Sequence, residues 1–74
     1  MSLKRVDCGT KVRVAPEFVK QICYDVITKE LRSDITPDTI LTVSCCRDYA
    51  GETYPTFQFE ETRREINGLF LELA

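Results

Sequence analysis

At 74 residues the chain is one small domain, because folding at this size buries only about 60% of the surface of the unfolded chain. Its hydrophobic fraction of 43% and charged fraction of 30% are ordinary for a folded protein and exclude a disordered one. The net charge is −2, and the complete lack of histidine excludes serine–histidine and cysteine–histidine nucleophiles within one chain. We therefore expect a single non-enzymatic domain over residues 1–74.

The charge is unevenly placed. Residues 1–14 have a net charge of +3 and the remaining residues a net charge of −5. Within the basic part, Lys11 and Arg13 alternate with Val12 and Val14, which predicts a half-buried strand over residues 10–14. The charged face of this strand either contacts phosphate or protects an exposed sheet edge from aggregation, and we favour the second interpretation.

A long amphipathic helix is predicted to follow. Pro16 suits a first helical position, where its missing N–H would have had no partner, and Glu17 complements the positive end of the helix dipole. Apolar residues then recur at three- and four-residue spacing and form one stripe: Phe18, Val19, Ile22, Cys23, Val26, Ile27 and Leu31. The helix is expected to end near Ser33 and Asp34.

A β-hairpin is predicted over residues 40–60. In the first strand, strict alternation places Leu41, Val43 and Cys45 on a buried face and leaves Cys46 on the polar face. After a loop at 48–53, the run from Tyr54 to Phe59 alternates again, with its phenylalanines expected in the core.

The C-terminal residues allow two interpretations. Ile66, Leu69, Phe70 and Leu73 fit one helix through Leu73, whereas Asn67–Gly68 could end a short helix and lead into a final strand. We favour the single helix. The expected fold is α+β: a small β-α-β-β sandwich with one long amphipathic helix on an antiparallel sheet and a C-terminal helix.

The four cysteines suggest little chemistry. They make no pair at zinc-ligand spacing, so we expect no metal and no other cofactor. The sequence has neither a signal-like apolar start nor a membrane-spanning segment, so we expect a cytoplasmic protein with reduced thiols. A redox role for Cys45 and Cys46 ranks last, because a disulfide between adjacent cysteines requires a strained ring.

Protein–protein interaction is the function that remains. The apolar residues Leu69, Phe70, Leu71 and Leu73 can hardly all face one small core, so we expect this segment to bind a protein partner and to form a homodimer. Small acidic chains of this kind serve as adaptors, regulators or inhibitors, including those carried by phages and mobile elements.

The alternative is a small nucleic-acid-binding domain. In it, Lys11 and Arg13 of the basic strand would hold phosphates, and Tyr54 of the aromatic hairpin would stack on bases.

Overall fold

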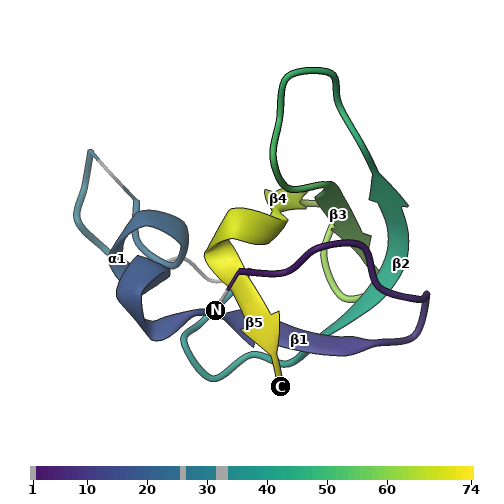
Figure 1. Cartoon of the computed structure of the whole chain (residues 1–74). Helices are drawn as coiled ribbons and strands as arrows, with labels where there is room; N and C mark the ends of the chain where they lie inside the picture. The colour runs from purple at the N-terminus through teal and green to yellow at the C-terminus, as the bar shows by residue number, and fades with distance from the viewer. Residues whose placement is uncertain (1, 26, 32–33) are drawn as a thin grey trace.

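The computed structural model describes residues 2–25, 27–31 and 34–74. The elements follow in the order β1 (Lys11–Val14), the 3-10 turn η1 (Pro16–Phe18), α1 (Val19–Ile22), β2 (Leu41–Arg47), β3 (Thr56–Phe59), β4 (Ile66–Asn67), the 3-10 turn η2 (Gly68–Phe70) and β5 (Leu71–Leu73). The strands form one antiparallel sheet of five, in the order β4-β3-β2-β1-β5 (Figure 1).

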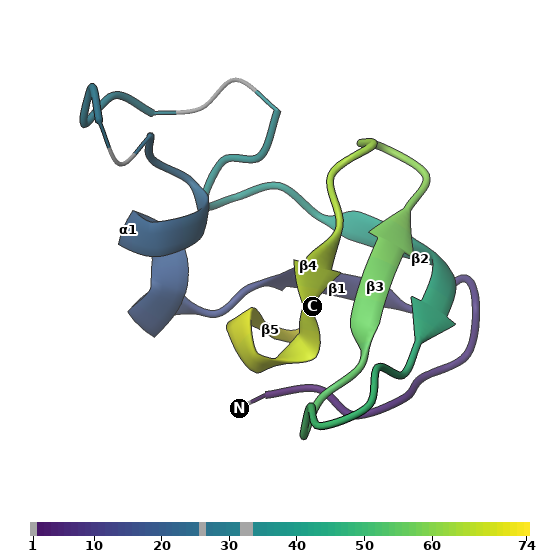
Figure 2. The ribbon, with the colours of Figure 1, turned by 90° about the horizontal axis from the view of Figure 1, so that it is seen from above.

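The sheet curls strongly, because its two edge strands are neighbours in the chain. Strands β4 and β5 lie at opposite edges, yet only the three residues of η2 separate them. A flat sheet of five strands would place its edges about 19 Å apart, whereas the four Cα steps from Asn67 to Leu71 reach at most about 15 Å. The sheet therefore closes into a half-open barrel, with η2 bridging its edges (Figures 1 and 2).

The inside of this curled sheet is the core. Its fully buried side chains come from four of the five strands and from the segment between β1 and β2: Val12, Val14, Cys23, Ile35, Leu41, Val43, Phe57 and Leu71. The alternation predicted for β1 is confirmed, because its charged side chains are exposed and its valines are buried. The predicted hairpin is also confirmed as the antiparallel pair β2–β3.

The long helix predicted from Pro16 to Ser33 is wrong. Helical structure ends at Ile22, and Tyr24 instead forms an antiparallel bridge with Leu31. The carboxylate of Asp25 accepts hydrogen bonds from the backbone N–H groups of Ile27 and Thr28, at 2.8 and 2.9 Å. This local acceptor offers the backbone an alternative to helical bonding. Val26, which belonged to the predicted stripe, and the predicted helix end at Ser33 lie outside the described residues.

The C-terminal helix is wrong as well. In its place the chain forms β4, η2 and β5. The side chain of Asn67 accepts a hydrogen bond from the N–H of Leu69 at 2.9 Å, so this asparagine begins a 3-10 turn where the sequence suggested the end of a helix. The fold is consequently a mostly antiparallel sheet, and not the β-α-β-β sandwich expected from the sequence.

A β-bulge in β2 reverses the predicted orientation of two cysteines. Strand β2 pairs Val43 with Phe59 and Cys45 with Gln58, so Ser44 is an extra residue in the ladder. After the bulge, Cys46 lies opposite the buried Phe57 and packs against the core. Cys45 is therefore on the outer face beside Gln58, where simple alternation had placed Cys46.

The described residues contain neither a membrane-spanning helix nor a metal-binding group of side chains. None of their helices is long and apolar enough to span a membrane. No three of their cysteine, aspartate or glutamate side chains are grouped so that they could hold a metal ion.

Candidate functional site

A shallow groove lies beside η2. It has a volume of about 420 Å³, and its lining comes from the β2–β3 loop, from β4 and from η2: Glu52, Thr53, Tyr54, Asn67, Leu69 and Phe70. We call it the η2 groove. It combines two aromatic rings and a solvent-exposed leucine with one carboxylate, which is the mixture of surfaces found where a protein holds an apolar segment of a partner.

The side chain of Asn67 holds this groove together. Its amide nitrogen donates to the carboxylate of Glu52 and to the carbonyl oxygen of Tyr54, each at 2.9 Å. Its carbonyl oxygen accepts the hydrogen bond from Leu69. One amide thus connects the β2–β3 loop to η2 and fixes the groove's polar wall against its apolar one.

The other side of η2 is fixed by aromatic packing. The rings of Phe70 and Phe18 meet edge to face, with their centroids 5.1 Å apart and an angle of 85° between their planes. The N–H of Ala15 donates to the carbonyl oxygen of Phe70 at 2.9 Å. Phe70 remains half-buried after these contacts, and Leu69 is 39% exposed.

The N-terminal arm, residues 2–9, is hydrogen-bonded to η2. The N–H of Leu3 donates to the carbonyl oxygen of Gly68 at 2.8 Å. The hydroxyl of Ser2 donates to the carbonyl oxygen of Leu69 at 2.9 Å. The arm begins beside the yellow η2 turn in both views and then crosses to β2 (Figures 1 and 2). The N-terminal arm and the C-terminal segment therefore together position the η2 groove.

The four apolar residues expected to bind a partner do not form one surface. Leu69 and Phe70 line the η2 groove. Leu71 is fully buried in the core, and Leu73, which is 57% exposed, lies on β5. Of the four, only the first two belong to a hollow that a partner could occupy.

The structure also separates the three residues expected to contact nucleic acid. Tyr54 lines the η2 groove, whereas Lys11 and Arg13 lie on the outer face of β1. The guanidinium of Arg13 forms an ion pair with Glu72 at 2.7 Å, and the ammonium of Lys11 donates to the hydroxyl of Thr42 at 2.6 Å. The basic strand is therefore partly neutralised by the strands beside it.

A carboxylate clamp lies next to Lys11. Glu61 accepts two hydrogen bonds from Thr42, one from the hydroxyl at 2.6 Å and one from the backbone N–H at 2.7 Å. These bonds hold the pKa of Glu61 below its ordinary value of 4.5, and Lys11 adds a smaller effect in the same direction. The clamp joins the loop after β3 to β2 and has the character of a structural contact.

We predict that the Glu61 clamp makes stability depend on acid pH. Because the folded-state pKa is lowered, the stabilisation is fully present above the ordinary value of 4.5 and is lost as the pH falls through the lowered value. Glu61→Gln should lower the Tm at neutral pH, and its difference from wild type should shrink on acidification. Thermal melts across the pH range measure this. Glu60→Gln, at the exposed neighbouring residue, should not reproduce the pattern, and equal profiles for both variants would contradict the prediction.

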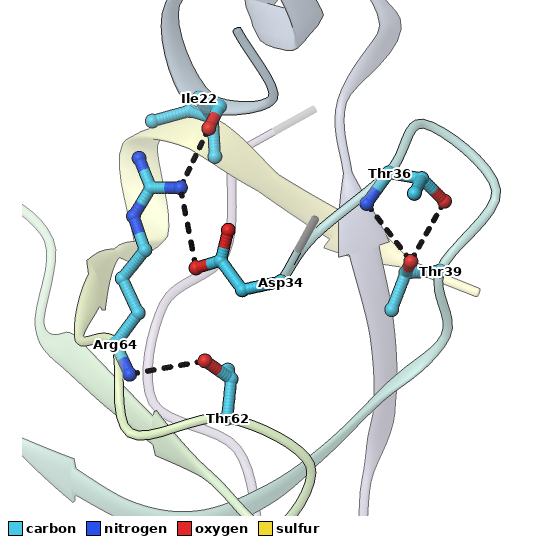
Figure 3. Close-up of polar contacts among 6 residues, drawn as sticks. All are labelled: Ile22, Asp34, Thr36, Thr39, Thr62 and Arg64. Atoms are coloured by element: carbon cyan, nitrogen blue, oxygen red, sulfur yellow. Dashed lines mark hydrogen bonds and ion pairs between the residues drawn. The ribbon is translucent and has the colours of Figure 1, made fainter. Parts of the chain in front are cut away.

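Arg64 connects the chain segment between β1 and β2 to the barrel. Its guanidinium donates to the carbonyl oxygen of Ile22, at the end of α1, at 2.7 Å and lies 3.9 Å from the carboxylate of Asp34 (Figure 3). Its backbone N–H donates to the hydroxyl of Thr62. Cys23, the next residue after α1, is fully buried, and this burial raises the pKa of its thiol. The thiol is thereby a core group, as its place in the apolar pattern suggested.

A second hollow, of about 580 Å³, lies on the segment between β1 and β2. It is lined by Val19, Lys20, Gln21, Tyr24, Asp25 and Lys29. Next to it in the chain, Ile27 at the turn is 86% exposed and Leu31 is 50% exposed. The carboxylate of Asp25 is already engaged by the turn.

Comparisons with known proteins found no relative. No protein-family model, no curated protein and no solved structure matches the chain. Any functional conclusion therefore depends on the chemistry of the described surface.

Proposed function

We propose that this protein is a small non-enzymatic binding module that holds a short, extended segment of a partner protein in the η2 groove. The observation that carries this proposal is the solvent-accessible apolar wall formed by Tyr54, Leu69 and Phe70 around one fixed carboxylate. Binding is stoichiometric, as in an adaptor, regulator or inhibitor. The complex forms in the cytoplasm, where the thiols of the chain remain mostly reduced.

The charge of the groove selects the chemistry of the bound segment. Glu52 supplies the only charge among the six lining residues, all of which lie in the described part of the chain. Its carboxylate is oriented by Asn67 and faces no lysine or arginine of the lining. A segment with an apolar side chain for the floor and an arginine or lysine for Glu52 is complementary to this groove.

Nucleic acid is the weaker alternative. A carboxylate beside the aromatic ring of Tyr54 repels phosphate. On β1, the ion pair between Arg13 and Glu72 reduces the positive charge available to a nucleic acid. These observations favour a protein segment over a nucleic-acid strand.

Selection from a display library of random short peptides against the immobilised protein tests the proposal. We expect enriched peptides to combine an aromatic or aliphatic side chain with arginine or lysine. By fluorescence polarisation, Leu69→Glu or Tyr54→Ala should weaken such a peptide by about 10-fold or more, because each removes part of the apolar wall. Leu31→Glu, which alters an exposed leucine outside the groove, is the matched control.

The other outcomes are equally informative. Glu52→Lys should reduce the preference for basic peptides while the apolar requirement persists. Equal affinity for wild type and Leu69→Glu, or a failure to enrich any peptide class, would overturn the proposal. Binding of a labelled single-stranded oligonucleotide that depends on Lys11 and not on Leu69 would support the nucleic-acid alternative instead.

We propose in addition that two copies associate along β5. Through its register with β1, the strand points the carbonyl oxygen of Leu71 and the N–H and C=O groups of Leu73 away from β1, toward the edge of the sheet. Such groups can pair with a strand of a second copy. The exposed side chain of Leu73 lies at the same edge and offers apolar surface to that strand.

A further inference from the structure

Three of the four cysteines surround the bulge in β2. The thiol of Cys8, in the N-terminal arm, donates to the carbonyl oxygen of Ser44 at 3.2 Å. Ser44 is the extra residue of the bulge, and Cys45 and Cys46 follow it directly. Residues far apart in the sequence are thus brought to one place on the surface.

The bulge places the two adjacent cysteines on opposite faces of β2. Cys46 pairs with the buried Phe57 and packs against the core, so its side chain points inward. Cys45 lies on the outer face with the neighbouring Gln58. Cys45 and Cys46 are both half-buried, whereas Cys8 is exposed. Because Cys46 packs against the core, Cys8 and Cys45 are the pair whose side chains lie outside it.

The two residues are neighbours on the surface. The carbonyl carbon of Ser44 is bonded to the nitrogen of Cys45, so the 3.2 Å contact places the Cys8 sulfur at most about 6 Å from the Cα of Cys45. The sulfurs of a disulfide are about 2 Å apart. Rotation of the two side chains, together with a movement of the exposed arm, must therefore bring the sulfurs together.

The arm is already held against β2 on both sides of Cys8. The N–H of Gly9 donates to the carbonyl oxygen of Val43 at 2.7 Å, and Arg5 forms an ion pair with Asp48 at 2.9 Å. These contacts keep Cys8 beside the bulge before any covalent bond forms. The effective concentration of one thiol at the other is correspondingly high.

Positive charge lies close to the cysteine pair. Hydrogen bonds from the guanidinium of Arg47 to the side chains of Cys45 and Tyr49 raise the pKa of Arg47. Arg5, in the arm, donates to the carbonyl oxygen of Cys46 at 3.4 Å. Cysteines that react with disulfides are commonly found in such electropositive surroundings.

We propose that Cys8 and Cys45 form a reversible regulatory disulfide by exchange with a low-molecular-weight disulfide such as oxidised glutathione. The Cys45 thiolate attacks one sulfur of oxidised glutathione, which releases one glutathione thiolate and leaves a mixed disulfide. The Cys8 thiol loses its proton and attacks the Cys45 sulfur, which releases the second glutathione. The two protein thiols lose two electrons and two protons in all, and the glutathione disulfide gains them.

The bond would cross-link the arm to β2 and close the chain between residues 8 and 45. Such a loop restricts the unfolded chain strongly, so the oxidised protein should melt roughly 10 °C higher than the reduced one. Because the same arm supports η2 through Leu3, oxidation would also hold that turn in place. This inference does not depend on what the groove binds.

Incubation of the 74-residue protein with oxidised glutathione at low protein concentration tests the inference. Intact mass should show the loss of two hydrogen atoms, and non-reducing peptide maps should join the peptide of Cys8 to that of Cys45. Cys46→Ser, which alters the adjacent inward cysteine, should cross-link like wild type. Cys8→Ser and Cys45→Ser should stop at a glutathione adduct or fail to react.

Three results would overturn the proposal. They are a cross-link that survives Cys45→Ser, a wild-type protein that accumulates only glutathione adducts, and disulfides that join two chains. A melt of each reduced variant ensures that the protein is folded before oxidation. Addition of urea to unfold the chain should abolish the preference for the pair Cys8 and Cys45, because the arm then no longer lies on β2.

Discussion

Replacement of Gly68 by alanine is expected to destabilise the fold by about 1–3 kcal/mol or more, the cost of forcing extra atoms into a packed interior. A Cβ at this position would overlap the carbonyl oxygen of Leu3 and would lie 2.9 Å from a ring carbon of Phe57. Neither neighbour can easily move, because Leu3 is held by its hydrogen bond to Gly68 and the phenylalanine is fully buried. Urea denaturation of the purified variant measures the loss.

Gly51→Ala is the matched control for this substitution. Gly51 has a φ of +85°, and a Cβ there would meet nothing within 4 Å. Its cost of about 1 kcal/mol comes from the backbone conformation alone. If Gly68→Ala were no more destabilising than Gly51→Ala, close packing of η2 against the arm would not be the reason for glycine at position 68.

The leucines of β5 should differ sharply in their effect on stability. Leu71 is fully buried, so Leu71→Ala should cost about 2–5 kcal/mol through lost burial and the cavity left behind. A domain of this size holds only about 4–11 kcal/mol in total. Leu73 is 57% exposed, and Leu73→Ala should change stability by no more than about 0.5 kcal/mol. Equal losses for the two variants, measured by urea titration, would contradict the assignment of Leu71 to the core.

The same pair of variants tests association through β5. If two copies pair along this edge, light scattering should show a dimer of the wild type and a smaller average mass for the folded variant Leu73→Ala. An unchanged mass would contradict the pairing. Truncation after Gly68 is unsuitable for this test, because it removes the buried Leu71 and all of β5, one of the two strands that pair with β1, and should unfold the chain.

The parts of the fold that could be predicted are those with a local signal. Alternation in residues 11–14 and in the second strand of the hairpin, β3, follows from the two-residue period of strands, and the structure confirms both and the pairing of β2 with β3. The apolar stripe after Pro16 also had the right period for a helix. There the carboxylate of Asp25 and the bridge between Tyr24 and Leu31 determine the structure, and spacing alone does not reveal either contact.

The cysteines show how one residue defeats a periodic argument. The bulge at Ser44 shifts the alternation by one position, so Cys46 faces the core and Cys45 faces outward. Nothing in the residues 41–47 by themselves marks that position. It depends on the pairing with β3 and on the arm that donates to the carbonyl oxygen of Ser44.

The groove was foreseen only in part. Leu69 and Phe70 were notable in the sequence because the C-terminal segment has more apolar residues than one small core can bury. Glu52 contacts Asn67 and Phe18 contacts Phe70 over long sequence distances, which a single sequence does not indicate. The dipeptide Asn67–Gly68 was the available signal, because it is typical of turns between strands as well as of helix ends.

The bridging of the sheet edges by η2 also has a consequence for how the chain acquires its structure. Strand β1 lies between β2 and β5, and its Val12 pairs with Leu73. Pairing between residues so distant in sequence requires closure of nearly the whole chain, which slows folding to the range of milliseconds to seconds. On a ribosome, β1 would therefore keep one open edge until Leu73 had emerged.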